Sequence, residues 1–276
     1  MTEVGYTPIN LPSQGVLYTD SEGASLVPEG MVHVRQLTVR ENSILYETGV
    51  QINERVNQII KLACKLPDTA VQGGLTHDDL LVTDRLAILI SLRLVTFDGK
   101  YSFKWKCDEC GASNTENTDI KESLNEITPE KIAEKQLRDG LITEDEAKSF
   151  VLAEPIKVTL RDAGKTVGVR FMRGKDEEQQ IKFARKARAS KNTADDPLVF
   201  RLGLQIVQLE GEKLSGREKD AFIRSLTMRD IREIEIAIEK HETGIDMGMM
   251  VDCRACGATN EKDLPINAEF FRPTEL

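Results

Sequence analysis

The chain has 276 residues, of which 40% are hydrophobic and 30% charged, with a formal net charge of −9. This composition is that of a soluble globular protein with one large or two modest domains, and its acidity argues against non-specific binding to nucleic acid or anionic membranes. The sequence has neither a signal-peptide pattern nor a run of about 18 apolar residues, so we expect a protein of the reducing cytoplasm with no membrane insertion.

The first 30 residues predict an extended docking arm, because they are rich in Gly, Pro and Ser. Within residues 1–30, the apolar side chains of Leu11, Leu17 and Tyr18 surround a Pro/Gly turn. A segment too polar to fold alone but carrying such side chains docks on its own domain or on a neighbour. We expect Leu11, Leu17 and Tyr18 to contact a partner subunit.

Residues 31–125 predict an α+β domain. Partial alternation over residues 31–39 indicates a strand, and helical spacing from Glu41 to Lys65 indicates a helical segment that Gly49 divides in two. Cys64 falls on the apolar stripe of this segment and is expected to be a buried core residue.

The most apolar segment of the chain is the helix predicted from Leu86 to Val95. Because it is hydrophobic nearly all round, we expect it to be buried on most sides. Arg85 and Arg93 are its exceptions, and we expect both guanidinium groups to reach carboxylates at the edge of the core.

One eight-residue motif, C-x-x-C-G-A-S/T-N, occurs twice, at residues 107–114 and 253–260. Each copy follows a strand-like run, residues 101–105 and 247–251 respectively. Two residues between cysteines let both thiolates face one ion, and the following glycine fits the positive φ that such a turn needs. The sequence therefore predicts one tetrahedral, structural zinc site in a zinc ribbon, with four ligands: Cys107, Cys110, Cys253 and Cys256.

Two disulfides or a redox pair would use the same cysteines. A redox C-x-x-C opens a helix, whereas Gly-Ala-Ser-Asn opens none, and a reducing compartment favours metal. Closing the loop between the copies costs about 4–5 kcal/mol of chain entropy, while structural zinc can return about 10–16 kcal/mol. Four thiolates would also leave no position for water, which argues against a catalytic zinc.

Between the two copies, residues 126–245 predict a mainly helical insertion, and the polar residues 114–119 lead towards it. Apolar periodicity, capping residues and a Gly turn indicate five helices and a hairpin of two strands: helices at 128–139, 143–153, 198–209, 216–226 and 228–242, and strands at 156–161 and 166–172.

A basic helix is also predicted in the insertion, with five cations: Lys182, Arg185, Lys186, Arg188 and Lys191. Acidic residues at 176–178 precede it and offset its charge. We therefore interpret it as a solvated face or a patch that docks on an acidic partner, in preference to a nucleic-acid site.

Residues 246–276 complete the ribbon with the second motif and add a tail. Phe270 and Phe271 form an exposed-looking aromatic pair, which we expect to anchor in a partner pocket. The three histidines lie far apart in sequence, and no P-loop, G-x-S-x-G or G-x-G-x-x-G motif occurs. We expect neither enzymatic activity nor a small-molecule substrate.

Five segments, taken in chain order, resemble the baseplate hub subunit, or baseplate hub assembly chaperone, family of contractile-tailed bacteriophages. They are residues 11–18, the strand at 31–39, the helix ending at 62–64, Leu80-Leu81-Val82-Thr83-Asp84-Arg85, and Phe103-Lys104-Trp105-Lys106-Cys107-Asp108-Glu109-Cys110-Gly111. The likeness covers roughly residues 8–125 and the second motif. It implies a non-enzymatic component of the tail baseplate, made in the host cytoplasm, with other baseplate proteins as partners and several copies in a symmetric assembly.

The sequence thus predicts an α+β fold: a small β-rich, four-cysteine zinc-ribbon neck with packed helices and a mainly helical inserted domain. Its predicted function is to bind other proteins of the baseplate, either as a permanent subunit or as a transient chaperone. The alternative is a zinc-ribbon nucleic-acid-binding factor that would use Lys104, Lys106, Arg254 and the basic helix.

Overall fold

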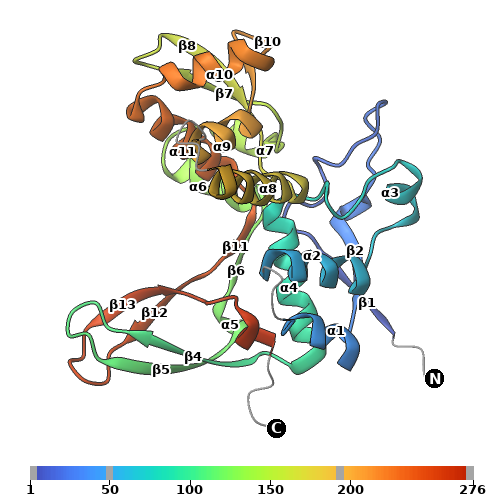
Figure 1. The fold of residues 1–276 in the computed structure, drawn as a ribbon, viewed down its shortest axis with the longest axis vertical. Helices are drawn as coiled ribbons and strands as arrows, with labels where there is room; N and C mark the ends of the chain where they lie inside the picture. The colour runs from blue at the N-terminus through green and yellow to red at the C-terminus, as the bar shows by residue number, and fades with distance from the viewer. Residues whose placement is uncertain (1–4, 48–51, 191–195, 272–276) are drawn as a thin grey trace.

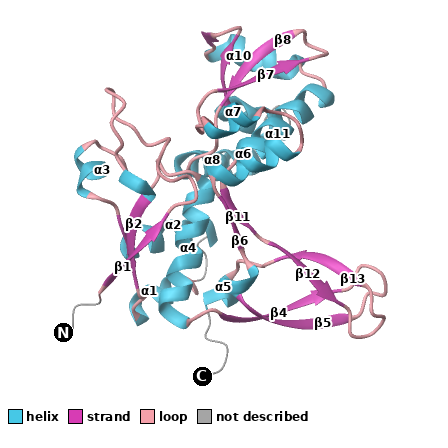
Figure 2. Ribbon diagram, turned by 180° about the vertical axis from the view of Figure 1, so that it is seen from behind, coloured by secondary structure: helices cyan, strands magenta, loops and turns pink. Residues whose placement is uncertain are grey.

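The computed structural model describes residues 5–47, 52–190 and 196–271. Figures 1 and 2 show three parts: an N-terminal part, a pair of long hairpins that projects to one side, and an insertion at the other end of the molecule. No helix among the described residues is long and apolar enough to cross a membrane. Gly49 and Lys191, to which we assigned a helix break and a basic-helix position, lie outside these residues.

The N-terminal part packs a three-stranded antiparallel sheet, in the order β1-β2-β3, on short helices. Its elements are β1 (Tyr6–Asn10), the 3-10 helix η1 (Pro28–Gly30), β2 (Met31–Arg35), α1 (Val39–Ile44), α2 (Ile52–Ala63), β3 (Cys64–Lys65) and α3 (Asp68–Gln72). The strand expected over residues 31–39 ends early because Thr38 and Glu41 form a capping box that begins α1. Cys64 is buried, as predicted.

The arm closes over its own domain. Strand β1 forms an edge of the sheet that the sequence did not reveal. The loop that follows it enters the core, where Leu11 is 1% and Tyr18 2% exposed. Ser13 donates from its N and Oγ to the buried Asp84 carboxyl (3.1 and 2.5 Å), and Tyr18 donates from its hydroxyl (2.5 Å). Burial raises the pKa of Asp84, and these donors hold the arm on it.

Helix α4 (Val82–Phe97) is the centre of the molecule. It contacts β1, β2, α2, α8, β11 and the C-terminal 3-10 helix η2, and none of its residues is exposed. Arg85 lies near carboxylates, as expected, with Asp78 at 3.8 Å and Glu177 at 3.7 Å.

For Arg93 the same expectation is wrong. Its side chain is fully buried, donates to the Lys100 carbonyl, and lies 5.3–5.8 Å from the ring centres of Phe97, Tyr101 and Phe270. The electron-rich faces of these rings take the place of a carboxylate.

Two hairpins form the projecting ribbon. Strand β4 (Lys100–Lys106) pairs with β5 (Ser113–Asp119), and β12 (Gly248–Asp252) pairs with β13 (Thr259–Asp263). Residues 114–119, a polar stretch expected only to lead into the insertion, belong to strand β5, because pairing with β4 overrides their polar composition. The buried side chains of the ribbon lie between the hairpins and come from alternate positions: Tyr101, Phe103, Trp105, Val251 and Leu264.

A pair of strands, here called the neck, connects the insertion to the rest of the chain: β6 (Asn125–Ile127) pairs with β11 (Gly244–Asp246). The short α5 (Ile120–Ser123) precedes the neck. Above it lie α6 (Pro129–Arg138), α7 (Glu144–Lys148), α8 (Gly174–Ser190), α9 (Pro197–Gln205), α10 (Gly216–Ser225) and α11 (Met228–His241), with a four-stranded antiparallel sheet of order β10-β9-β8-β7. The strands are β7 (Ile156–Leu160), β8 (Lys165–Val169), β9 (Ile206–Leu209) and β10 (Glu212–Lys213).

Most of the expected elements of the insertion are confirmed, and two are wrong. The helix expected at 143–153 ends at Lys148, and residues 150–153 form no regular secondary structure. The helix expected at 198–209 ends at Gln205, because β-branched Ile206 and Val207 begin a strand that pairs with β8.

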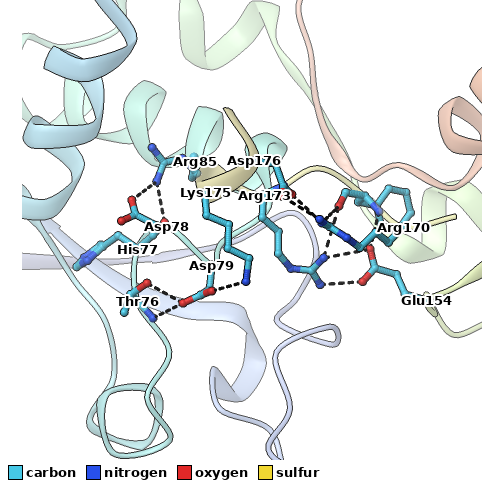
Figure 3. Close-up of polar contacts among 11 residues, drawn as sticks. Thr76, His77, Asp78, Asp79, Arg85, Glu154, Arg170, Arg173, Lys175 and Asp176 are labelled. Carbon is cyan, nitrogen blue, oxygen red and sulfur yellow. Dashed lines mark hydrogen bonds and ion pairs between the residues drawn. The ribbon is translucent and has the colours of Figure 1, made fainter. Parts of the chain in front are cut away.

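A second attachment holds the insertion to the N-terminal part (Figure 3). The Val82 N–H donates to the Met172 carbonyl and the Gly174 N–H to the Leu80 carbonyl, each at 3.0 Å. Lys175, at the start of α8, forms an ion pair with Asp79 at 2.8 Å. The insertion is thus joined to the rest of the chain at both the neck and the first turn of α8.

The docked arm predicts a difference between two glycines. A Cβ at Gly15 (φ +73°) would lie 2.2 Å from the Val27 carbonyl oxygen, whereas a Cβ at Gly23 (φ +86°) would meet no atom within 4 Å. Both Gly→Ala changes cost roughly 1–2 kcal/mol for the left-handed backbone, and Gly15→Ala adds a clash with backbone. Urea unfolding should give a clearly lower midpoint for Gly15→Ala than for Gly23→Ala; equal midpoints would contradict the docked arm.

Candidate metal centre

The two C-x-x-C motifs fold into matching turns at the tips of the two hairpins. In the first, the Cys107 N–H donates to the Ala112 carbonyl and the Gly111 N–H donates back to the Cys107 carbonyl, both at 3.0 Å. The second turn repeats these bonds between Cys253, Ala258 and Gly257 at 2.9 and 2.8 Å. Gly111 and Gly257 have φ of +70° and +74°, which confirms the predicted left-handed position.

The turns bring the four cysteines together. The ligand atoms of Cys107, Cys110, Cys253 and Cys256 all lie within 4.8 Å of one another, and the Sγ atoms of two pairs, 107 with 256 and 110 with 253, are 3.7 Å apart. A disulfide would need about 2.05 Å. A tetrahedron with metal–sulfur bonds of about 2.3 Å has edges of about 3.8 Å, so this donor set fits one metal ion.

Each motif also supplies an asparagine that crosses to the opposite turn. Asn114 accepts the Arg254 N–H at 3.0 Å and directs its amide nitrogen at the Cys253 sulfur, 3.5 Å away. Asn260 accepts the Asp108 N–H at 2.8 Å and directs its amide nitrogen at the Cys107 sulfur, 3.7 Å away. This reciprocal exchange joins the turns through protein groups alone.

The sequence analysis did not identify Asn114 and Asn260 as functional residues. The signal was present, because Asn stands at the same offset in both copies of the motif. Both side chains are buried, and both act on the first cysteine of the other turn. Groups that hydrogen-bond a metal ligand orient it and tune its charge, and the two asparagines are placed for that role.

Hydrogen bonding prepares the first cysteine of each turn to be a thiolate. The Cys256 and Ala255 backbone N–H groups and the Asn114 amide lower the pKa of Cys253 to about 6. The Cys110 and Glu109 N–H groups likewise lower the pKa of Cys107. Because thiolates are the form that binds metal, these donors favour metal binding near neutral pH.

The residues expected to contact a partner lie mostly inside the chain. Leu11, Tyr18, Phe270 and Phe271 are 0–2% exposed, and Leu17 is partly buried against the core. The expectation that the aromatic pair is exposed is wrong: η2 (Ala268–Phe271) inserts both rings, and Phe270 packs edge-on against Tyr101. A role for these five residues in partner contacts stays a prediction.

The crossed asparagines predict a measurable effect on metal affinity. Asn260→Ala leaves the Asp108 N–H without its acceptor and the Cys107 sulfur without an amide donor, so Co²⁺ titration should show affinity lowered by about 10–100-fold. Asn114→Ala should behave alike. Asn117→Ala, an exposed position on the same strand as Asn114, is the control and should leave affinity unchanged. Equal affinity in all three variants would show that the exchange has no role at the site.

Comparison with known families gives a match over most of the chain. The family model described as T4 bacteriophage base plate protein matches residues 23–272, which include all four cysteines, both neck strands and the insertion. No curated protein and no solved structure matches the chain significantly. The match spans most of the chain, and the chain therefore belongs to the T4 bacteriophage base plate protein family.

Proposed function

We propose that this protein is a structural component of the hub region of a contractile phage tail, which binds other baseplate proteins and is held in shape by one zinc ion. The observation that carries the proposal is the convergence of four cysteine sulfurs from the two ends of the insertion. In a baseplate protein, such a closure supplies a fixed shape for neighbours to bind.

Zinc is the metal that suits this donor set best. Four thiolates in a tetrahedral arrangement select zinc or iron–sulfur chemistry, and the C-x-x-C turns at hairpin tips match the zinc-ribbon pattern. With Cys107, Cys110, Cys253 and Cys256 all bound, the ion would have no open position, so its role would be structural.

The ion would act by closing a loop of structure. Strand β4 follows α4 directly, and β11, which precedes β12, packs against α4. A metal bond at the far tips of the two hairpins therefore completes a ring that runs through α4, both hairpins and the neck. Closing the ring would fix the neck, and the neck and the contacts at the start of α8 together set the direction in which the insertion points.

A protein partner is better supported than nucleic acid. On the basic helix α8, Arg185 forms an ion pair with Glu54 at 2.9 Å and Lys182 with Glu178 at 3.2 Å. These cations are offset within the chain, and the whole chain carries a net charge of −9. The resemblance to hub subunits supports placement at the centre of the baseplate, where the contacts are with other tail proteins.

Zinc content tests the metal part of the proposal. Purified protein should carry one zinc ion per chain by elemental mass spectrometry, and chelation should lower the melting temperature. Cys107→Ser should lose zinc and loosen the ribbon. Cys64→Ser is the matched control. Cys64 is buried in the N-terminal core, so its substitution should leave the zinc content unchanged. Wild-type protein without metal, or unaltered zinc in Cys107→Ser, would contradict the site.

Particle composition tests the baseplate part. Mass spectrometry of purified virions of the encoding phage should find the chain with other tail proteins, and the isolated protein should show no salt-dependent DNA binding. Presence only in assembly intermediates would assign it the role of a chaperone. Absence from both would refute a baseplate role.

A further inference from the structure

The ribbon formed by β4, β5, β12 and β13 projects away from the rest of the molecule (Figures 1 and 2). Contacts across the ribbon show which positions face inwards: Asn114 reaches Cys253, Asn260 reaches Cys107, and the Lys262 Nζ lies 5.9 Å from the centre of the Trp105 ring. Because side chains alternate along a strand, the remaining positions form two outer faces, one on each hairpin. These two faces differ in charge.

The outer face of the β4–β5 hairpin is basic. Lys104 and Lys106 are exposed on β4, and the register places them beside the short side chains of Thr115 and Ser113 on β5. Lys100, at the start of β4, lies on the same face directly opposite Asp119, so the unopposed positive charge of this face is that of Lys104 and Lys106. Within the part of the chain that the structure describes, Lys104 and Lys106 form no ion pair or side-chain hydrogen bond.

The outer face of the β12–β13 hairpin is acidic. Glu261 and Asp263 are exposed on β13, and Asp252 is exposed on β12. Neither Glu261 nor Asp263 is paired with a cation among the described residues. Met250 lies directly opposite Glu261 and is 70% exposed, which places an uncovered apolar side chain in the middle of this face.

We propose that the ribbon stacks on the ribbon of a second copy of this chain, the basic face of one against the acidic face of the next. The two lysines are two residues apart on one strand, and so are the two carboxylates, so each pair of charges is separated by about 6.7 Å along its strand. The Ser113 and Thr115 side chains are short, so they leave room on the basic face for Met250 of the adjoining copy.

A second copy fits both faces better than an unrelated partner. The faces lie on opposite sides of one ribbon, so the contact is head-to-tail, and only the copy at each end of a row keeps one free face. A basic protein would cover only the acidic face, whereas a row of copies covers both with one contact. Exposed ion pairs are individually weak and screened by salt, so we expect the association to be concentration- and salt-dependent.

Charge reversal tests the proposal with metal-loaded, full-length protein. The variant K104E/K106E has two acidic faces, and E261K/D263K has two basic faces. By sedimentation velocity, wild-type protein should associate with rising concentration, and raising salt from about 0.05 to about 0.5 M should reverse this. Each variant alone should remain a monomer. An equimolar mixture should associate again, which also shows that both variants are folded.

The matched control is K157E/K165E, which reverses two exposed strand lysines in the insertion. It makes the same change in net charge as K104E/K106E and should associate like wild type. The proposal is overturned if wild-type protein stays monomeric, if the mixture does not associate, or if the control is equally impaired. Zinc is measured in the same samples, so a chain that stacks in this pattern without zinc would contradict the zinc site and still support the stacking.

Discussion

The two C-x-x-C turns, one on each side of the insertion in the sequence, meet with sulfur atoms 3.7 Å apart. An asparagine from each turn accepts a backbone N–H of the other. This contact converts two separate hairpins, each a two-stranded sheet with little stability of its own, into a ribbon with a buried interior. The crossed amides act on two of the four sulfur atoms that could hold a metal ion. The closure joins the far ends of the two hairpins, while the neck and the start of α8 attach the insertion.

Helix α4 lies at the base of the ribbon, at the opposite end from the cysteine turns. Its first turns hold the arm through Asp84 and contact the insertion through Arg85, while its last turns place Arg93 among the rings of Phe97, Tyr101 and Phe270. The arm and the C-terminal aromatic pair, which looked from the sequence like segments for a partner, therefore first serve the chain itself. Both termini of the described structure are fixed on the helix from which the ribbon starts.

The four cysteines could be predicted because the repeated motif carries its own geometry in the spacing and the glycine. Long amphipathic helices such as α6 and α11 could be predicted for a similar reason, since their apolar period is local. Strand β5 could not, because its polar residues become a strand only by pairing with β4. The burial of Phe270 and the aromatic environment of Arg93 depend on contacts between residues distant in sequence, which leave no local signal.

The shape of the ribbon depends most on the identity and geometry of what joins the two turns. X-ray absorption at the zinc edge of the purified protein measures this directly. We expect four sulfur neighbours at about 2.3 Å from the zinc and no light-atom ligand in the first shell. A shell of oxygen or nitrogen ligands, or cysteines joined by sulfur–sulfur bonds of about 2.05 Å with no zinc present, would contradict the closure of the ribbon by a metal ion.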